Sequence, residues 1–251
     1  LYAPDGKSVA QGSTLRNPAL AALLRRLAAE GPDAFYAGPN AQALVAAVNT
    51  SRGAPGDMIG ADLAAYRAKE RAPVCGRYRV WRICGMGPPS SGATTVLGIL
   101  GMLERFDLKK LGPRSAQSWH LIAEAMQLAY ADREKYLADA DFVDVPVRGL
   151  IDRGYLQRRS RLISPLRALG AYPAGNPPGA PARTPAVQVE PAGTTHFIAV
   201  DAAGNVATVT STVEGPFGSQ VVANGYVLNN ELTDFTLAPQ VNGQPVANRV
   251  E

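Results

Sequence analysis

Thr194 is the residue whose setting most clearly favours nucleophilic chemistry. The stretch before it, Pro173 to Gly193, contains six prolines and three glycines, which disfavour regular secondary structure. The stretch after it, Thr194-Thr195-His196-Phe197, opens an apolar run typical of a strand. If the Gly193–Thr194 bond is cut, Thr194 gains a free α-amine that can act as the base for its own hydroxyl. We expect glycine at this bond to add backbone freedom.

Other nucleophilic and metal chemistries are disfavoured. The chain lacks the Gly-x-Ser-x-Gly pattern of a serine hydrolase. Its two histidines, His120 and His196, are interpreted as structural, although alternation places His196 on the same side of a strand as Thr194. No His, Cys and Asp residues have the spacing of metal ligands, so neither a metal nor a cofactor is predicted.

Two acidic residues near the C-terminal end form a second candidate site. Glu231 and Asp234 are three residues apart, so one helical turn would bring their carboxylates together to hold a substrate ammonium group. From spacing alone, a solvated acidic turn is the better interpretation. The Gly87–Gly92 loop is not a phosphate-binding loop, because it lacks the lysine and carries two prolines.

Helices are predicted in the first part of the chain. Asn17-Pro18 and Gly31 are typical of a helix start and stop, and leucines 20, 23, 24 and 27 form one apolar face between them. A longer helix is expected from Ser115 or Ser118 to about Leu137. Its inward face is predicted to carry Trp119, Ile122, Met126 and Tyr130.

Strands dominate after residue 193. They are expected near 194–200 and 206–213, with Thr208, Thr210 and Thr212 on one face, and Asn224-Gly225 predicts a further hairpin. Earlier strands are expected between residues 71 and 87. Helices followed by strands buried on two sides favour an α+β fold, a layered helix–sheet–sheet–helix sandwich.

Composition narrows the classes of protein. The chain has 251 residues, of which 46% are hydrophobic, enough for a substantial core. The formal net charge is +4, and the basic residues are scattered and form no basic block, which argues against a nucleic-acid partner. No apolar stretch has the length of a membrane span. Cys75 and Cys84 are interpreted as two buried free thiols in preference to a disulfide.

Several motifs, taken together and in order, resemble the γ-glutamyltransferase (γ-glutamyltranspeptidase) family of N-terminal-nucleophile hydrolases. The resemblance covers essentially the whole chain, and Ala93 stands where the family's PPSSGG loop has its second glycine. The matching segments are Ala34–Gly38 (AFYxG), Pro88–Gly92 (PPSSG), Glu124–Val143 (EAxxLAxADRxxYLxDxDFV), Thr194–Phe197, Phe217–Ser219 and Asn229–Phe235.

The resemblance implies a four-layer αββα sandwich and a precursor that cuts itself between Gly193 and Thr194. Residues 1–193 would then be the C-terminal part of a large subunit, with the Pro/Gly-rich tail at 173–193. Residues 194–251 would be the N-terminal part of a small catalytic subunit, intertwined with the first in one domain. Thr194 corresponds to the nucleophile and Thr212 to the threonine that hydrogen-bonds it.

The resemblance also changes the interpretation of the acidic turn. Glu231 and Asp234 correspond to the pair that grips the α-amino group of a γ-glutamyl substrate. Glu214 takes a position near the same ammonium group. The implied reaction is hydrolysis or transfer of the γ-glutamyl group of glutathione-like compounds through a threonyl ester, without a cofactor.

Two alternatives stay open. A glutaryl or cephalosporin-type acylase of the same fold is disfavoured by the two carboxylates, because its substrate lacks the α-amine, and a non-catalytic relative would keep an uncut chain. The resemblance implies that residues outside this chain complete the site: an arginine before it, and a Ser-Ser pair and an oxyanion Gly-Gly after it. We therefore expect a longer gene product, or an inactive chain. The expected partners are the small-molecule substrate and the two subunits, which are compatible with a homodimer of heterodimers.

Overall fold

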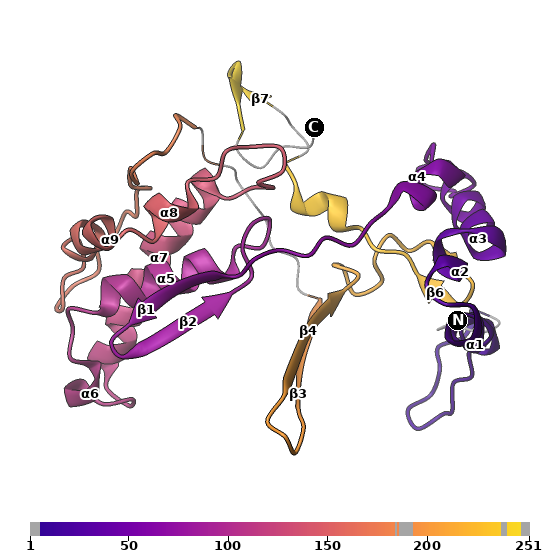
Figure 1. Cartoon of the computed structure of the whole chain (residues 1–251), viewed down its shortest axis with the longest axis horizontal. Coiled ribbons are helices and arrows are strands. Elements are labelled where there is room, and N and C mark those ends of the chain that lie inside the picture. The colour runs from indigo at the N-terminus through magenta and orange to yellow at the C-terminus, as the bar shows by residue number, and fades with distance from the viewer. Residues whose placement is uncertain (1–5, 184, 186–192, 237–239, 247–251) are drawn as a thin grey trace. The chain divides into compact units, whose positions relative to one another are not determined.

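The computed structural model describes residues 6–183, 185, 193–236 and 240–246. The chain forms two compact units (Figure 1). Unit 1 comprises Leu1–Lys69 and Glu190–Glu231, and unit 2 comprises Glu70–Val189 and Leu232–Glu251. Each unit therefore combines chain from both sides of the expected cleavage site. The mixture of helices and strands confirms the α+β class.

Helix α1 of unit 1, Pro18–Glu30, has the predicted ends. The Asn17 side chain accepts a hydrogen bond from the Leu20 N–H at 3.0 Å, and Gly31 ends the helix with a φ of 83°. The predicted apolar face is only partly buried, because α1 packs mainly on the short helix α2, Asp33–Tyr36. Leu23 is buried, whereas Leu24 is 55% exposed.

The rest of unit 1 places a small hairpin against helix α3, Gly38–Asn49. The hairpin consists of β5, Val222–Ala223, and β6, Tyr226–Val227. The turn residues Asn224 and Gly225 have φ values of 47° and 82°, as the Asn-Gly pair predicts. Helix α4, Gly60–Ala65, follows α3 and packs on it.

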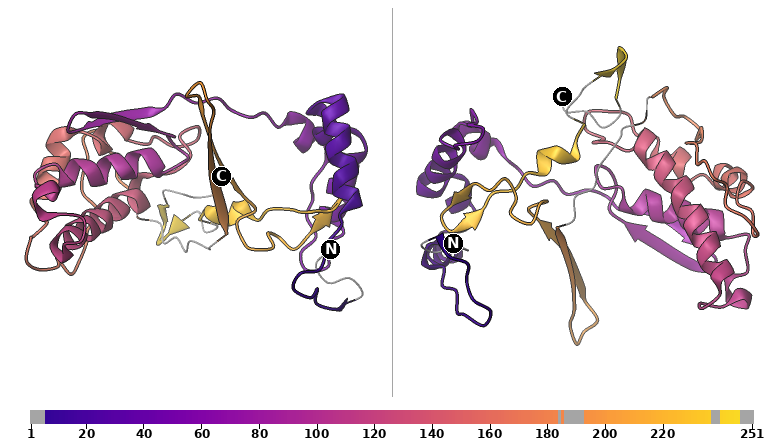
Figure 2. Two further views of the ribbon diagram at one scale, coloured as in Figure 1. Left: turned by 90° about the horizontal axis from the view of Figure 1, so that it is seen from below. Right: turned by 180° about the vertical axis from the view of Figure 1, so that it is seen from behind.

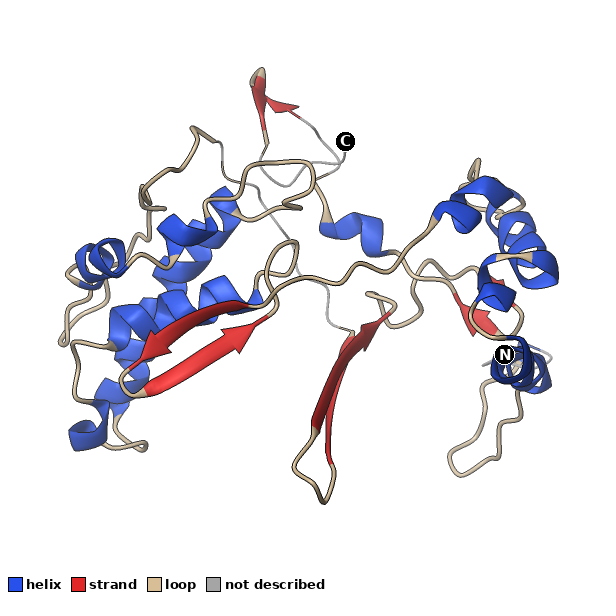
Figure 3. Cartoon of the chain, in the orientation of Figure 1, coloured by secondary structure: helices blue, strands red, loops and turns tan. Residues whose placement is uncertain are grey.

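A longer hairpin carries the expected nucleophile. Strand β3, Thr194–Val200, pairs antiparallel with β4, Val206–Thr212, as predicted (Figure 3). Asp201 closes the turn by accepting the N–H groups of Ala203 and Asn205. Every residue of β3 is exposed, and each sheet in the described residues has two strands. Both faces of this hairpin are therefore exposed to solvent along β3.

Unit 2 contains the main hydrophobic core, built on helices that pack around α5 (Figure 2). Met102, Leu121, Ala125, Leu128 and Ile163 are among its most buried residues. The helices are α5 (Gly92–Leu103), α6 (Leu108–Leu111), α7 (Ala116–Tyr136), α8 (Val147–Leu150) and α9 (Arg153–Ser160). Short strands β7 (Gln240–Val241) and β8 (Gln244–Pro245) pair near the C-terminus.

Ser115 caps helix α7 and Ile122 packs against the core, as predicted, but the other three residues of the predicted inward face are exposed. Trp119, Met126 and Tyr130 are 63%, 42% and 37% exposed. The buried face instead contains two charged residues, Glu124 and Asp132. Tertiary partners satisfy both carboxylates and remove the cost of burying them.

Those partners come from the chain that follows α7. Glu124 accepts hydrogen bonds from the Tyr172 hydroxyl at 2.5 Å and the Leu169 N–H at 3.1 Å. Asp132 accepts from the Tyr155 hydroxyl at 2.7 Å and pairs with Arg159 at 3.2 Å. These bonds tie α9 and the segment after it to α7.

The prediction of two free thiols is also wrong. Strands β1, Val74–Tyr78, and β2, Trp81–Gly85, form a hairpin in which Cys75 and Cys84 are direct partners. Their Cα atoms are 4.1 Å apart and their sulfurs form a disulfide. The two-residue turn fixes this register, since it brings residues at equal distances from it face to face. The described residues contain no helix that is both long and apolar enough to cross a membrane.

Candidate active site

The β3–β4 ladder places the expected nucleophile opposite a second threonine. Thr194 begins β3 and is the Cα partner of Thr212, which ends β4. His196 lies two residues along the same strand, opposite Thr210, and its Nδ1 lies 2.8 Å from the Thr210 hydroxyl oxygen. Alternation therefore gathers hydroxyl groups and an imidazole on one face of the hairpin.

The Thr212 hydroxyl is oriented toward the bond that is expected to be cut. Its oxygen accepts a hydrogen bond from the Glu214 N–H at 2.7 Å. It lies 3.4 Å from the carbonyl oxygen of Gly193, to which it can donate its proton. Because the hydroxyl accepts from one side and donates to the other, its direction is set by the backbone. The structure thus joins Glu214, Thr212 and Gly193 in one chain of hydrogen bonds.

The close approach of another backbone segment gives a structural reason for glycine at position 193. Its φ is outside the left-handed region that favours glycine. A Cβ at this position would overlap the carbonyl oxygen of Glu214. Any side chain would force this backbone away from the end of β4, and the role of glycine's backbone freedom in the cleavage stays a prediction.

Glu214 is held in an unusual backbone conformation just beyond β4. Its φ is 67°, and the residue is only 5% exposed. Such a conformation costs a non-glycine residue about 1–3 kcal/mol. The next residue, Gly215, donates its N–H to the Asn230 side-chain oxygen at 3.0 Å, which helps to fix this bend.

The acidic turn adopts the predicted helical conformation. Glu231 and Asp234 are the first and last residues of a 3₁₀ helix, in which residues three apart lie on the same side. Asn229 accepts the Glu231 N–H with its side chain at 3.0 Å. The Asn230 N–H donates to the Val213 carbonyl oxygen at 3.3 Å, so the start of this turn is attached to the end of β4.

Unit 1 therefore brings together most of the residues singled out in the sequence. One end of the β3–β4 hairpin contains Gly193, Thr194, Thr212 and Glu214. Asn230, the residue directly before Glu231, is hydrogen-bonded to the same end of the hairpin. The Asn230 contribution was not predicted. Its signal was the Asn-Asn pair directly before the acidic residue, since asparagine side chains commonly bond to nearby backbone.

A second polar cluster was missed because its members are far apart in the sequence. Asn40 is 2% exposed and donates to the Phe35 carbonyl oxygen at 2.7 Å. Its side-chain oxygen accepts from the Asn224 amide at 2.7 Å and the Tyr226 hydroxyl at 3.3 Å. The Asn17 amide donates to the Gly225 carbonyl oxygen at 2.5 Å. These bonds connect residues on opposite sides of the 193–194 boundary.

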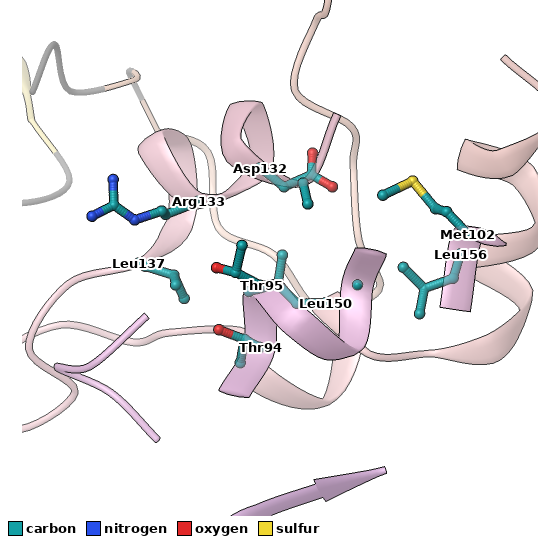
Figure 4. A pocket seen from close by; sticks show the side chains of 10 residues that line it. Thr94, Thr95, Met102, Asp132, Arg133, Leu137, Leu150 and Leu156 are labelled. Carbon is teal, nitrogen blue, oxygen red and sulfur yellow. The ribbon is translucent and has the colours of Figure 1, made fainter. Parts of the chain in front are cut away.

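One cavity in unit 2 is too small to be a substrate site. It lies between α5, α7, α8 and α9, as Figure 4 shows, and measures about 10 Å³. This volume holds about one water molecule. The Thr95 hydroxyl, which lines it, is buried without a hydrogen-bond partner in the described residues. None of the expected site residues lines this cavity.

The described part of the chain contains no group of three or more His, Cys, Asp or Glu side chains arranged to hold a metal. His120 lies near the start of α7, and its Nε2 is 2.8 Å from the Ser164 carbonyl oxygen. That contact gives this histidine a structural role.

Comparisons with known proteins bear on the family of this chain. A family model described as gamma-glutamyltranspeptidase matches residues 1–251. The glutathione hydrolase proenzyme of Escherichia coli (strain K12) is 37% identical over 96% of this chain and 40% of that protein. The Acylase ACY 1 proenzyme of Pseudomonas sp. (strain SE83) is 39% identical over 94% of this chain and 40% of that protein.

A solved structure agrees with these matches. The crystal structure of Helicobacter pylori γ-glutamyltranspeptidase is 35% identical, with a TM-score of 0.63, over 68% of this chain and 48% of that chain. The chain thus spans about 40% of the length of the two curated relatives and about half of the solved one.

Proposed function

Because this chain belongs to the gamma-glutamyltranspeptidase family, we propose that the protein cuts its own backbone and then transfers or hydrolyses γ-glutamyl groups. Residues 1–193 end the large subunit, and residues 194–251 begin the small catalytic subunit. Both the Escherichia coli and the Pseudomonas relative are named as proenzymes, which supports such a cleavage.

The cleavage proceeds by an acyl shift at the Gly193–Thr194 bond. The Thr194 hydroxyl oxygen attacks the Gly193 carbonyl carbon, and the C–N bond breaks as its nitrogen takes up the hydroxyl proton. Water then hydrolyses the resulting ester, leaving a carboxylate on Gly193 and a free amine and hydroxyl on Thr194. The Thr212 hydroxyl, 3.4 Å from the Gly193 carbonyl oxygen, supports this step, since it can donate to the oxygen as negative charge develops.

In turnover, the freed Thr194 acts on the γ-amide of the substrate. Its amine accepts the hydroxyl proton while the oxygen attacks the γ-carbonyl carbon, and the proton then passes to the leaving amine. Water or an acceptor amine resolves the γ-glutamyl ester. Thr212 is assigned to the nucleophile because it is the cross-strand partner of Thr194.

Carboxylates provide the preference for a γ-glutamyl group. Glu231 and Asp234 share one 3₁₀ turn, and both are assigned to the α-ammonium group of the substrate. Glu214 is assigned a place near the same ammonium group, supported by its position two residues beyond Thr212. A substrate without the α-amine would leave these carboxylates unpaired, which penalises its binding.

One observation carries the proposal: the arrangement of Thr194, Thr212 and the Gly193 carbonyl at the end of one hairpin. The test is mass spectrometry and N-terminal sequencing of the purified full-length protein. We expect two fragments, the smaller beginning Thr-Thr-His. Thr194→Ala should give one intact chain without turnover. An uncut, folded wild-type protein would favour a non-catalytic member of the family.

A second candidate is an acylase for dicarboxylic side chains, since the Pseudomonas relative is named an acylase. The two functions differ in whether the substrate carries an α-amine. Initial rates with γ-glutamyl-p-nitroanilide and glutaryl-p-nitroanilide therefore separate them. Faster release from the glutaryl compound would replace the γ-glutamyl assignment by the acylase.

A further inference from the structure

Unit 2 contains a second, larger cleft that the proposed reaction does not use. Its volume is about 790 Å³, within the range of small-molecule sites. Its lining residues include members of β1, α5 and α9. Both β1 and α9 pack against α5, and the three elements are labelled in Figure 1. None of the residues assigned to the reaction lines the cleft.

The charge of this cleft is strongly one-sided. One carboxylate, Glu104, stands among its described lining residues, against several guanidinium groups. The arginines that line it are Arg77, Arg79, Arg105, Arg153 and Arg161. Guanidinium groups remain charged at every physiological pH, so the excess of positive charge is permanent.

Two of the arginines have structural roles. The Arg105 guanidinium donates to the Ser160 hydroxyl at 2.8 Å and to the Ile163 carbonyl oxygen at 2.7 Å. The Arg79 guanidinium donates to the Phe106 carbonyl oxygen at 2.7 Å. These bonds fix two walls of the cleft to the core of unit 2.

The other three arginines have no such role. Arg77, Arg153 and Arg161 are exposed, and within the described residues none of their guanidinium groups forms a hydrogen bond or an ion pair. They come from β1 and from the two ends of α9. Like charges around one cleft repel one another until an anion enters it, so the cleft is arranged for a negatively charged ligand.

We propose that this cleft binds the phosphate groups of a small organic molecule. A phosphate monoester presents three acceptor oxygens and nearly two negative charges, whereas a carboxylate offers two oxygens and one charge. Guanidinium forks pair bidentately with phosphate oxygens, and three of them suit a phosphorylated ligand. Leu97, Ile151 and Leu156 supply apolar surface for its organic part.

Isothermal titration calorimetry on the full-length protein tests this, with ATP as the probe, without divalent cations and at physiological ionic strength. We expect saturable binding of ATP. The variant Arg77→Gln/Arg153→Gln/Arg161→Gln should bind at least about tenfold more weakly, because each lost contact is a charge-assisted hydrogen bond. The absence of saturable binding to the wild-type protein would overturn the proposal.

A matched control separates the cleft from net charge. The variant Arg16→Gln/Arg25→Gln/Arg52→Gln removes the same number of exposed arginines from unit 1, and it should bind ATP as the wild type does. If both triple variants bind ATP equally more weakly than the wild type, the loss of affinity follows from the change in net charge, and the proposed site is refuted. Citrate is the chemical control. If it binds as tightly as ATP, the preference for phosphate is wrong.

Loss of folding is distinguished from loss of binding. The melting temperature of each variant is measured first, and a destabilised triple variant is replaced by the three single variants. ATP should also raise the melting temperature of the wild type by mass action, and more than that of the cleft variants. Equal shifts in wild type and single variants would count against the site.

Discussion

The hydroxyl oxygen of Thr212 lies 3.4 Å from the carbonyl oxygen of Gly193, across the end of the β3–β4 hairpin. The same hydroxyl oxygen accepts a hydrogen bond from the Glu214 backbone N–H, with 2.7 Å between nitrogen and oxygen. The proton of Thr212 is thereby left to point at the carbonyl that the proposed cleavage attacks. Donors preset toward a developing oxyanion lower the barrier, since they need not reorient during the reaction.

Replacing Thr212 by valine should slow the self-cleavage. Valine keeps the shape and the strand preference of threonine but removes the donor. At 3.4 Å the contact is long, so we expect slowing by about tenfold, less than the 100-fold or more of a short oxyanion donor. The rate is followed by the appearance of the two fragments on denaturing gels. Thr212→Ser and Thr210→Val should cleave near the wild-type rate, and a normal rate in Thr212→Val would refute this role.

Gly193→Ala should disturb the hairpin end. Its methyl group would overlap the Glu214 carbonyl oxygen, so the strand must shift at a cost of about 1–3 kcal/mol. The unfolding free energy is best measured in a Thr194→Ala background, where the chain stays intact. Gly53→Ala is the matched control, because a methyl group there meets no atom within 4 Å. Equal stability of both variants would show that the close approach is not required.

Asn40→Ala should weaken the association of the two proposed subunits. The change removes a buried side chain that is hydrogen-bonded to Phe35, Asn224 and Tyr226, so the polar groups of these three residues lose that hydrogen-bond partner. We expect a loss of about 1–3 kcal/mol. It would appear as a lower melting temperature, or as separation of the fragments in size-exclusion chromatography. Asn49→Ala, which removes one exposed bond to the Met58 carbonyl oxygen, should have a smaller effect.

Tyr155 should make unit 2 sensitive to alkaline pH. Burial, the charge of Asp132 and the hydrogen bond to Asp132 raise the pKa of the phenol well above its usual range. A raised pKa in the folded state stabilises the protein below the unfolded value of about 10, and this contribution falls as the pH rises above it. Urea unfolding at pH 8 and at about pH 11 should show the loss.

The variant Tyr155→Phe isolates this effect. It should be less stable than the wild type by about 1–3 kcal/mol at pH 8, because Asp132 loses a buried donor. Between pH 8 and about 11 it should lose less stability than the wild type, because it has no phenol to ionise on unfolding. Parallel loss in both proteins would show that Tyr155 does not cause the alkaline sensitivity.

Features set by a few neighbouring residues could be predicted from the sequence. Asn17 and Gly31 bound α1, Ser115 begins α7, and Asn224-Gly225 forms the turn of the β5–β6 hairpin. The two strands on either side of the Asp201–Asn205 turn were also predicted from local pattern, whereas the link between Thr194 and Thr212 was implied only by the family resemblance. Hydrogen bonds to the nearest backbone and allowed φ values decide each of these, so distant residues are not needed.

Other features depended on contacts between distant residues. The buried face of α7 could not be predicted, because Glu124 and Asp132 are acceptable inside only where Tyr172, Tyr155 and Arg159 satisfy them. The same applies to the Asn40 cluster and to the arginine cleft, whose members lie on different elements. A polar residue is stable inside a protein only with its partners, and the tertiary structure alone decides which partners reach it.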